Sequence, residues 1–312
     1  MTPLAQAAHE YLAMRRALGY RLATAGRCLL QFVAFLDAQG ATHITVPLAL
    51  QWAHATTSLS RRTAWPALRL SMVRGFARYC HAADPRTEVP PVHLLPFRPA
   101  RARPYLYTDE EIGRLLAAAD QLPSRCGLRP VTYRCLLSLL IVAGLRISEA
   151  RRLSSDDIDW AEGMLTIRGT KFGKSRLVPL HVSSLAALAD YARRRDQLLK
   201  GQAASSFFIS DRGNPLHPNV IYQTFYRLSR QVGLRTPGAS HGPRLHDFRH
   251  RFALRTLVEW YRAGQDVEWH LPLLSTYLGH VSVSDTYWYL TACPELLGQA
   301  TRRLEQRWEE AV

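Results

Sequence analysis

The chain has 312 residues, of which 47% are hydrophobic and 21% are charged, and its formal net charge is +15. This length and composition predict a globular protein with room for two domains that each bury a core. The longest apolar stretch, residues 135–145, is too short to span a bilayer, and residues 1–20 lack the apolar core of a signal peptide. We therefore expect a cytoplasmic protein without a membrane partner.

The excess positive charge predicts a polyanionic partner, because releasing condensed counterions drives basic proteins onto nucleic acid. A genome that favours arginine is the alternative explanation, since only three of the 40 basic residues are lysines, Lys171, Lys174 and Lys200. The five cysteines, at positions 28, 80, 126, 135 and 293, form no C-x-x-C pair. That pattern indicates reduced thiols, as is usual in the cytosol.

Residues 1–84 are expected to form a helical domain of four or five short helices without a sheet. Apolar positions such as Leu29, Phe32 and Leu36 recur there at helical spacing. Residues 85–105 break that pattern with six prolines and several arginines. The composition predicts an extended interdomain linker that can follow a DNA backbone, and an ordinary surface loop is the alternative.

The region 106–312 is expected to combine helices with a small β-sheet, which places the whole chain in a mainly α, α+β class. A capping box begins a helix at Thr108, and the apolar stretch 131–143 predicts a central helix that Gly144 ends. Residues 164–168 and 176–180 are expected to pair as a hairpin. Further predicted elements are helices at 148–153, 185–199, 218–232, 245–263 and 272–278, a strand at 207–210, and a polar tail from about 293.

Arg146 and Lys171 occupy positions that favour exposure. Gly144 permits a sharp turn that aims Arg146 out of the core, where Glu149 can hold its guanidinium from one helical turn away. An arginine after a helix end is otherwise an ordinary surface residue. Lys171 lies in the predicted hairpin turn and, unlike arginine, can donate a proton; Lys174 is the competing candidate.

His246 and Arg249 are three residues apart and therefore share a helix face, with His250 beside them. The simplest alternative is a basic helix surface. A zinc pair of His246 and His250 is a second alternative, because the two have the spacing of helical metal ligands. We disfavour zinc, since no H-E-x-x-H glutamate is present and Arg249 would place a positive charge beside the metal.

His280 follows a predicted helix end at Gly279, and Tyr287 and Tyr289 come shortly after it. Each of these residues alone is compatible with simple packing. Together with Arg146 and Arg249, however, they form a set that suits breaking a phosphodiester without a metal. Arginine forks bind phosphate oxygens in pairs, imidazole transfers protons near neutral pH, and a phenol oxygen can act as a covalent nucleophile.

The ordered set G-L-R-I-S-E, a hairpin lysine followed by R-L-V-P-L, H-x-x-R, L-G-H and a downstream tyrosine resembles the tyrosine recombinase (phage integrase) family over about residues 106–295. The resemblance implies a helical core-binding domain and a catalytic domain that form a clamp on DNA, without metal, cofactor or ATP. It also implies an active site of Arg146, Lys171, His246, Arg249, His280 and the nucleophile Tyr289. Tyr289 is preferred to Tyr287 because the family commonly places its tyrosine nine residues after the L-G-H histidine.

The resemblance implies a site-specific recombinase that acts through a 3′-phosphotyrosyl intermediate at the nucleoid. A homo-tetramer on two duplexes, with a dimer at each site, is the expected assembly, and other recombinases of the same element are further candidate partners. The ending D-T-Y-W-Y-L is similar to recombinases of transposons, which favours integration, excision or transposition of a mobile element. The alternatives are a type IB topoisomerase-like enzyme and a sequence-specific DNA-binding protein with a vestigial catalytic set.

Overall fold

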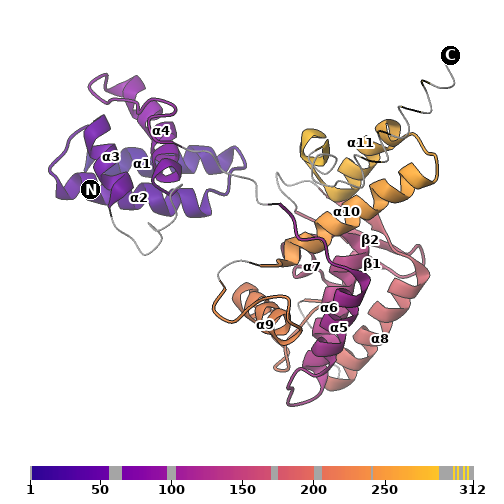
Figure 1. Ribbon diagram of the computed structural model, residues 1–312. Helices are drawn as coiled ribbons and strands as arrows, with labels where there is room; N and C mark the ends of the chain where they lie inside the picture. The colour runs from indigo at the N-terminus through magenta and orange to yellow at the C-terminus, as the bar shows by residue number, and fades with distance from the viewer. Residues whose placement is uncertain are drawn as a thin grey trace. The chain divides into compact units, whose positions relative to one another are not determined.

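A computed structural model of the chain describes residues 2–55, 65–96, 103–169, 175–199, 206–239 and 242–287, with the single positions 298, 301, 305 and 308. The chain divides into two compact units, Met1–Ala102 and Arg103–Val312. Helices dominate the described residues, and one three-stranded sheet accompanies them (Figure 1). The predicted mainly helical fold with a small sheet is therefore confirmed. None of the helices in the described ranges is both long and apolar enough to cross a membrane.

The first unit is a helical bundle, as predicted. Its described residues form α1 (Pro3–Ala17), α2 (Ala23–Ala38), α3 (Val46–His54) and α4 (Trp65–Ala83). Buried side chains from all four helices form one core, in which Phe32 of α2 packs at a ring separation of 5.0 Å from Trp52 of α3. The helical spacing of the apolar residues thus produces the buried faces that hold the bundle together.

The described part of the proline-rich segment lies against the first unit. Arg74 of α4 donates from Nε to the carbonyl oxygen of Pro90 at 2.8 Å and from Nη2 to that of Pro91 at 2.9 Å. Val89 and Leu95 pack against the core of the same unit. Residues 90 and 91 belong to no helix or strand, so their carbonyl oxygens need a donor from elsewhere, and a guanidinium fork can supply two hydrogen bonds. The role of residues 85–105 as an interdomain linker stays a prediction.

The second unit is built around α6 (Leu128–Ala143), which packs against α5 (Asp109–Asp120), α8 (Val182–Leu199) and α10 (Leu245–Arg262). Because α6 has apolar residues around much of its circumference, it is buried on several sides. The predicted capping box at Thr108 starts α5. Further helices in the described residues are α7 (Ile147–Ala150), η1 (Ser155–Asp157, a 3₁₀ turn), α9 (Pro218–Gln231) and α11 (Val267–Leu278).

The sheet of the second unit is antiparallel, in the order β1 (Ile158–Asp159), β2 (Met164–Ile167) and β3 (Arg176–Pro179). The predicted pairing of the second and third strands is confirmed, with Leu165 opposite Val178 and Ile167 opposite Arg176. The strand β1 was not predicted, because two residues are too short to show an alternating pattern. The hairpin turn at 170–174 lies outside the described residues.

Several predicted elements differ from the structure in their bounds or type, and α6 and α8 each begin three residues earlier than predicted. Residues 207–210 form no regular strand but a single bridge between Ile209 and Pro215, because Phe207 and its two apolar neighbours are pinned in the core rather than beside another strand. The helix α7 ends at Ala150 instead of continuing to 153. The helix α11 begins at Val267, five residues before Pro272, because the Asp266 carboxylate caps it.

Candidate active site

Arg146, His246, Arg249 and His280 converge at one place in the second unit. Arg146 is the N-cap of α7, His246 and Arg249 lie on the first turns of α10, and His280 follows the end of α11. Both arginines lie close enough to affect the protonation of both imidazoles. The structure therefore brings together four of the six residues that the sequence pointed to. Lys171 and Tyr289 lie outside the described residues.

Glu149 orients Arg146, as the spacing predicted. The Arg146 Nη1 atom donates to Glu149 Oε1 at 2.8 Å, and the Arg146 backbone N–H donates to Oε2 at 3.0 Å. The side chain of Arg146 is 26% exposed, whereas that of Glu149 is 2% exposed. A buried carboxylate thus fixes a guanidinium that keeps an open side toward solvent.

Arg176 shares the same carboxylate, and sequence reasoning did not find it. Its Nη1 and Nη2 atoms donate to the two oxygens of Glu149 at 3.1 and 2.8 Å. Burial by itself raises the pKa of Glu149, but the hydrogen bonds and charges of Arg176 and Arg146 outweigh it and hold that pKa at about 2. The sequence contains no spacing signal for this contact, because residues 149 and 176 come from different elements.

Arg249 is a buried brace rather than a residue of an exposed helix face. It is 1% exposed, its Nη1 atom donates to the carbonyl oxygen of Gly144 at 3.0 Å, and its Nη2 atom donates to that of Leu278. Arg146 makes a similar contact, because its Nη2 atom donates to the carbonyl oxygen of Gly279 at 3.0 Å. Each guanidinium is therefore held by backbone that belongs to a sequence motif other than its own.

Gly279 meets two requirements at once. It closes α11 with a φ of +67°, and a Cβ atom there would lie 2.8 Å from Nη1 of Arg176. The first requirement favours glycine because other residues avoid the left-handed region, and the second because the guanidinium already fills the space. The glycine of L-G-H thus permits both the turn that precedes His280 and the close approach of Arg176.

Replacing Gly279 with alanine is expected to cost more stability than the same change at Gly264, which ends α10 with a φ of +69° and has no neighbouring atom within 4 Å. Gly264→Ala should cost roughly 1–2 kcal/mol from the backbone alone. Gly279→Ala adds the displacement of Arg176 and should therefore cost more than this. Urea unfolding of the two variants measures the difference, and equal losses of stability would contradict the proposed contact.

The surroundings of the cluster favour the neutral form of both imidazoles. Desolvation among neighbouring side chains, followed by the charge of Arg249, lowers the pKa of His246 to about 4, although this residue keeps an exposed edge. Desolvation and the charges of Arg249 and Arg146 likewise lower the pKa of His280 to about 4. A neutral imidazole can accept a proton at one nitrogen and donate one from the other.

The two imidazoles are therefore expected to titrate near pH 4 in the free protein, which NMR of the ring nitrogens measures. Their folded pKa lies below the unfolded value of about 6.5, so the unfolded chain binds the protons first. The associated stability is complete above about pH 6.5 and is lost as the pH falls toward 4. Arg249→Met removes a positive charge and should raise both midpoints; unchanged midpoints would contradict this electrostatic explanation.

The segment that leads to the candidate nucleophile is tied to His280. Thr286 is fully buried, and its Oγ1 atom lies 2.7 Å from Nδ1 of His280. Tyr287 is half-exposed, and residues 284–287 are helical. The continuous described stretch therefore ends beside the cluster, at a point two residues before Tyr289 in the sequence.

His246 and His250 have no third candidate zinc ligand beside them among the described residues. The rings of His246 and His250 lie 4.7 Å apart at an interplanar angle of 84°. The described residues contain no group of three or more histidine, cysteine, aspartate and glutamate side chains that could hold a metal ion.

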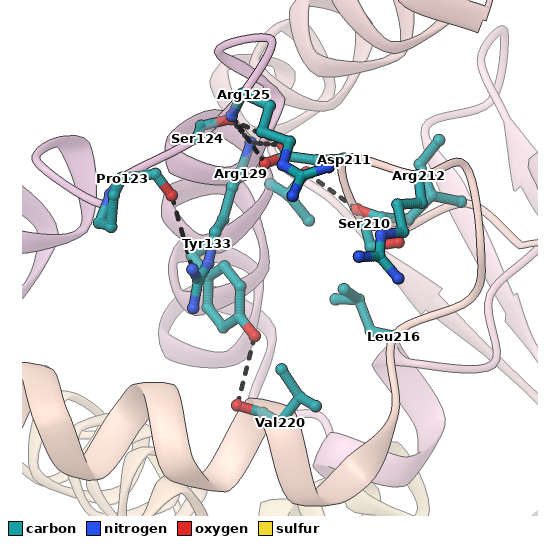
Figure 2. Close-up of a pocket in the computed structure, with 12 residues that line it drawn as sticks. Pro123, Ser124, Arg125, Arg129, Tyr133, Ser210, Asp211, Arg212, Leu216 and Val220 are labelled. Carbon is teal, nitrogen blue, oxygen red and sulfur yellow. Dashed lines mark hydrogen bonds between the residues drawn. The ribbon is translucent and has the colours of Figure 1, made fainter.

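A cavity of about 680 Å³ lies elsewhere in the second unit and contains none of the clustered residues. Figure 2 shows it between the start of α6, residues 209–216 and the start of α9, with Arg125, Arg129 and Arg212 among its lining. Asp211 at its edge accepts hydrogen bonds from the hydroxyl of Ser124 at 2.7 Å and from the backbone N–H of Arg129 at 2.9 Å. The Asp211 carboxylate thus caps the start of α6 and holds the residues that precede this helix.

Two arginines braced by backbone carbonyls and two neutral imidazoles form a site of the class that binds a phosphodiester and moves protons around it. The chain belongs to the Phage integrase family, whose sequence profile matches residues 106–295. This family comprises the tyrosine recombinases, enzymes that cleave and rejoin DNA. The predicted family is therefore confirmed.

Relatives of known name support this membership over the whole chain. The chain is 57% identical to a Sinorhizobium fredii protein described as integrase/recombinase y4rB, over 99% of both. It is 32% identical to tyrosine recombinase XerC of Chlamydia trachomatis, over 71% of this chain and 64% of that one. The fold is similar to that of the Tn1549 transposon integrase solved with transposon right end DNA, with a TM-score of 0.68, 16% identity, and 98% and 99% coverage.

Proposed function

We propose that the chain is a site-specific recombinase that cuts and rejoins double-stranded DNA through a 3′-phosphotyrosyl intermediate. The convergence of Arg146, His246, Arg249 and His280 carries this proposal, because such a cluster can neutralise a phosphate and handle protons at its edge. The formal charge of +15 supports a DNA partner. The six residues expected from the sequence, including Lys171 and Tyr289, form the proposed catalytic set.

In the proposed reaction the phenol oxygen of Tyr289 attacks the scissile phosphorus. The bond from phosphorus to the tyrosine oxygen forms while the bond to the 5′-oxygen breaks, so the number of phosphoester bonds is unchanged and no ATP is needed. His246 accepts the phenol proton, which its neutral imidazole permits. Lys171 donates a proton to the departing 5′-oxygen. A 5′-hydroxyl of another strand then reverses these steps and rejoins the DNA.

The arginines stabilise the charge that develops on the non-bridging oxygens. Because carbonyl and carboxylate partners already hold Arg146 and Arg249, the guanidiniums need little reorganisation when the pentavalent species forms. When the Thr286 hydroxyl donates to Nδ1 of His280, the ring proton lies on Nε2 and can be donated to the phosphate.

Complete exchange requires two strand cuts on each of two duplexes, so the proposed assembly is a tetramer with a dimer at each DNA site. A solved lambda integrase is a tetramer on a Holliday junction, and its fold resembles this chain with a TM-score of 0.59. The names of the relatives and the transposon integrase fold support a role in moving a genetic element. Because the proposed substrate is genomic DNA, we place the activity in the cytoplasm at the nucleoid.

Mapping protein-linked DNA ends tests this proposal. Cells that carry the encoding element would express the protein and be lysed in SDS, and DNA captured covalently with the protein would be sequenced from its attached ends. We expect ends at discrete sites, and a nicked duplex of that sequence should trap an adduct in EDTA. Binding to DNA without any adduct, in EDTA or in magnesium, would instead favour the DNA-binding alternative. Relaxation of plasmids that lack the mapped sites would favour the topoisomerase alternative.

A further inference from the structure

Arg176 makes contacts that the proposed chemistry does not yet use. Its side chain is 9% exposed, and all three of its nitrogen atoms have acceptors. Two of them hold the oxygens of Glu149, and Nε donates to the carbonyl oxygen of Tyr277 at 2.7 Å. It begins β3 and pairs with Ile167 at the end of the ladder that adjoins residues 168–175, the stretch of sequence that contains Lys171.

The charges around Glu149 explain what a second cation accomplishes. With Arg146 as its sole partner, the buried carboxylate would cancel the positive charge that Arg146 offers to a phosphate. With Arg176 on the same carboxylate, the three side chains carry a net charge of +1. Because Coulomb interactions are strong among groups removed from water, this difference acts directly on an anion beside Arg146.

The same guanidinium also joins three elements of the site. It contacts Glu149 of α7 and Tyr277 near the end of α11, and it lies beside Gly279, where an added Cβ would lie 2.8 Å from its Nη1 atom. Gly279 in turn offers its carbonyl oxygen to Arg146 and precedes His280. A displacement of Arg176 would therefore disturb two partners of Arg146 and the turn that precedes His280.

We propose that Arg176 is a positioning residue of the recombination reaction: it balances Glu149 so that Arg146 presents a positive charge to the scissile phosphate, and it holds the α11 end that leads to His280. This inference rests on the proposed function. It adds to the site a third cation, which does not touch the phosphate itself and acts on it by way of Glu149 and Arg146.

Single-turnover cleavage of a nicked duplex built from the mapped DNA ends tests the role of Arg176 in the full-length protein. Arg176→Met is expected to slow cleavage by about 100-fold, because an unbalanced Glu149 neutralises Arg146. Its affinity for DNA should stay within about threefold of wild type, because Arg176 is one of 40 lysine and arginine residues that attract the DNA phosphates. Arg168→Met, which removes an exposed cation from the other side of the hairpin, should cleave at the wild-type rate.

The double variant Arg176→Met/Glu149→Gln separates charge balance from simple structural support. Removing the carboxylate restores the charge of Arg146, so the double variant should cleave about tenfold faster than Arg176→Met alone. Support alone predicts the reverse, because the second change removes a further contact. Arg176→Lys keeps the positive charge and is expected to cleave within about tenfold of the wild-type rate. If Arg176→Met does not fold, this variant tests whether the charge at position 176 supports cleavage.

Two results would overturn the role of Arg176 while wild type still forms the adduct. One is an Arg176→Met variant that cleaves at the wild-type rate, or a double variant Arg176→Met/Glu149→Gln that cleaves no faster than Arg176→Met. The other is an Arg176→Lys variant that binds DNA normally but cleaves about 100-fold slower than wild type or worse. Absence of an adduct in wild type would overturn the proposed function itself.

Discussion

Replacing Tyr289 with phenylalanine is expected to abolish the covalent protein–DNA adduct. The change removes one oxygen atom, and without it no phosphotyrosyl bond can form. The cleavage rate should fall by at least about 10⁴-fold, as is usual when a covalent nucleophile is removed. Trapping on a nicked duplex, followed by denaturing gel electrophoresis, measures the loss. DNA binding should persist, because a phenol hydroxyl contributes little to the contacts with the DNA backbone.

Tyr287→Phe is the matched control for this experiment. Tyr287 lies two residues earlier and its ring is half-exposed, so the variant loses only a solvated hydroxyl. It should form the adduct at nearly the wild-type rate. If Tyr289→Phe still traps DNA and Tyr287→Phe does not, the nucleophile is Tyr287 and the assignment from the nine-residue spacing after His280 is wrong.

Replacing Arg249 with methionine is expected to damage both stability and cleavage. The side chain is buried, and its loss leaves the carbonyl oxygens of Gly144 and Leu278 without this donor. The variant should lose about 2–5 kcal/mol in its free energy of unfolding. Cleavage by the folded fraction should fall by about 10³-fold, because a preorganised positive charge beside the phosphate is gone. Urea unfolding and single-turnover cleavage measure the two effects separately.

Arg255→Met provides the control on the same helix. Arg255 is 51% exposed and pairs at the surface with Asp109 and Glu259, at 3.0 and 3.8 Å. Its removal should cost less than about 1 kcal/mol, since exposed ion pairs contribute little. An Arg249→Met variant as stable as Arg255→Met would contradict the bracing of the two motifs. Undiminished cleavage by folded Arg249→Met would contradict its role at the phosphate.

Local patterns predicted much of the second unit correctly. The capping box at Thr108, the helix end at Gly144 and the contact from Arg146 to Glu149 all depend on residues within one or two turns of chain. Their hydrogen bonds and backbone angles follow from nearby residues alone. The Asp266 cap of α11 was equally local, and the prediction overlooked it because Pro272 gave a more familiar start signal.

Other features depend on which elements pack together. Residues 207–210 have the composition of a strand, yet within the described part of the chain their strand pairing is limited to the one bridge between Ile209 and Pro215. The burial of Arg249 was hidden for a related reason. Its partners at 144 and 278 are far away in the sequence, so a helix pattern alone favoured an exposed basic face.

The sequence alone determined the family, the order of the helices and the identity of the candidate catalytic residues, because chemical type and short-range spacing are properties of the chain itself. Only the tertiary structure decided that Arg176 and Arg146 share the carboxylate of Glu149, and that desolvation and nearby arginines lower the pKa of both imidazoles. Charge balance and desolvation depend on distances between groups that are far apart in the sequence, and packing alone sets those distances.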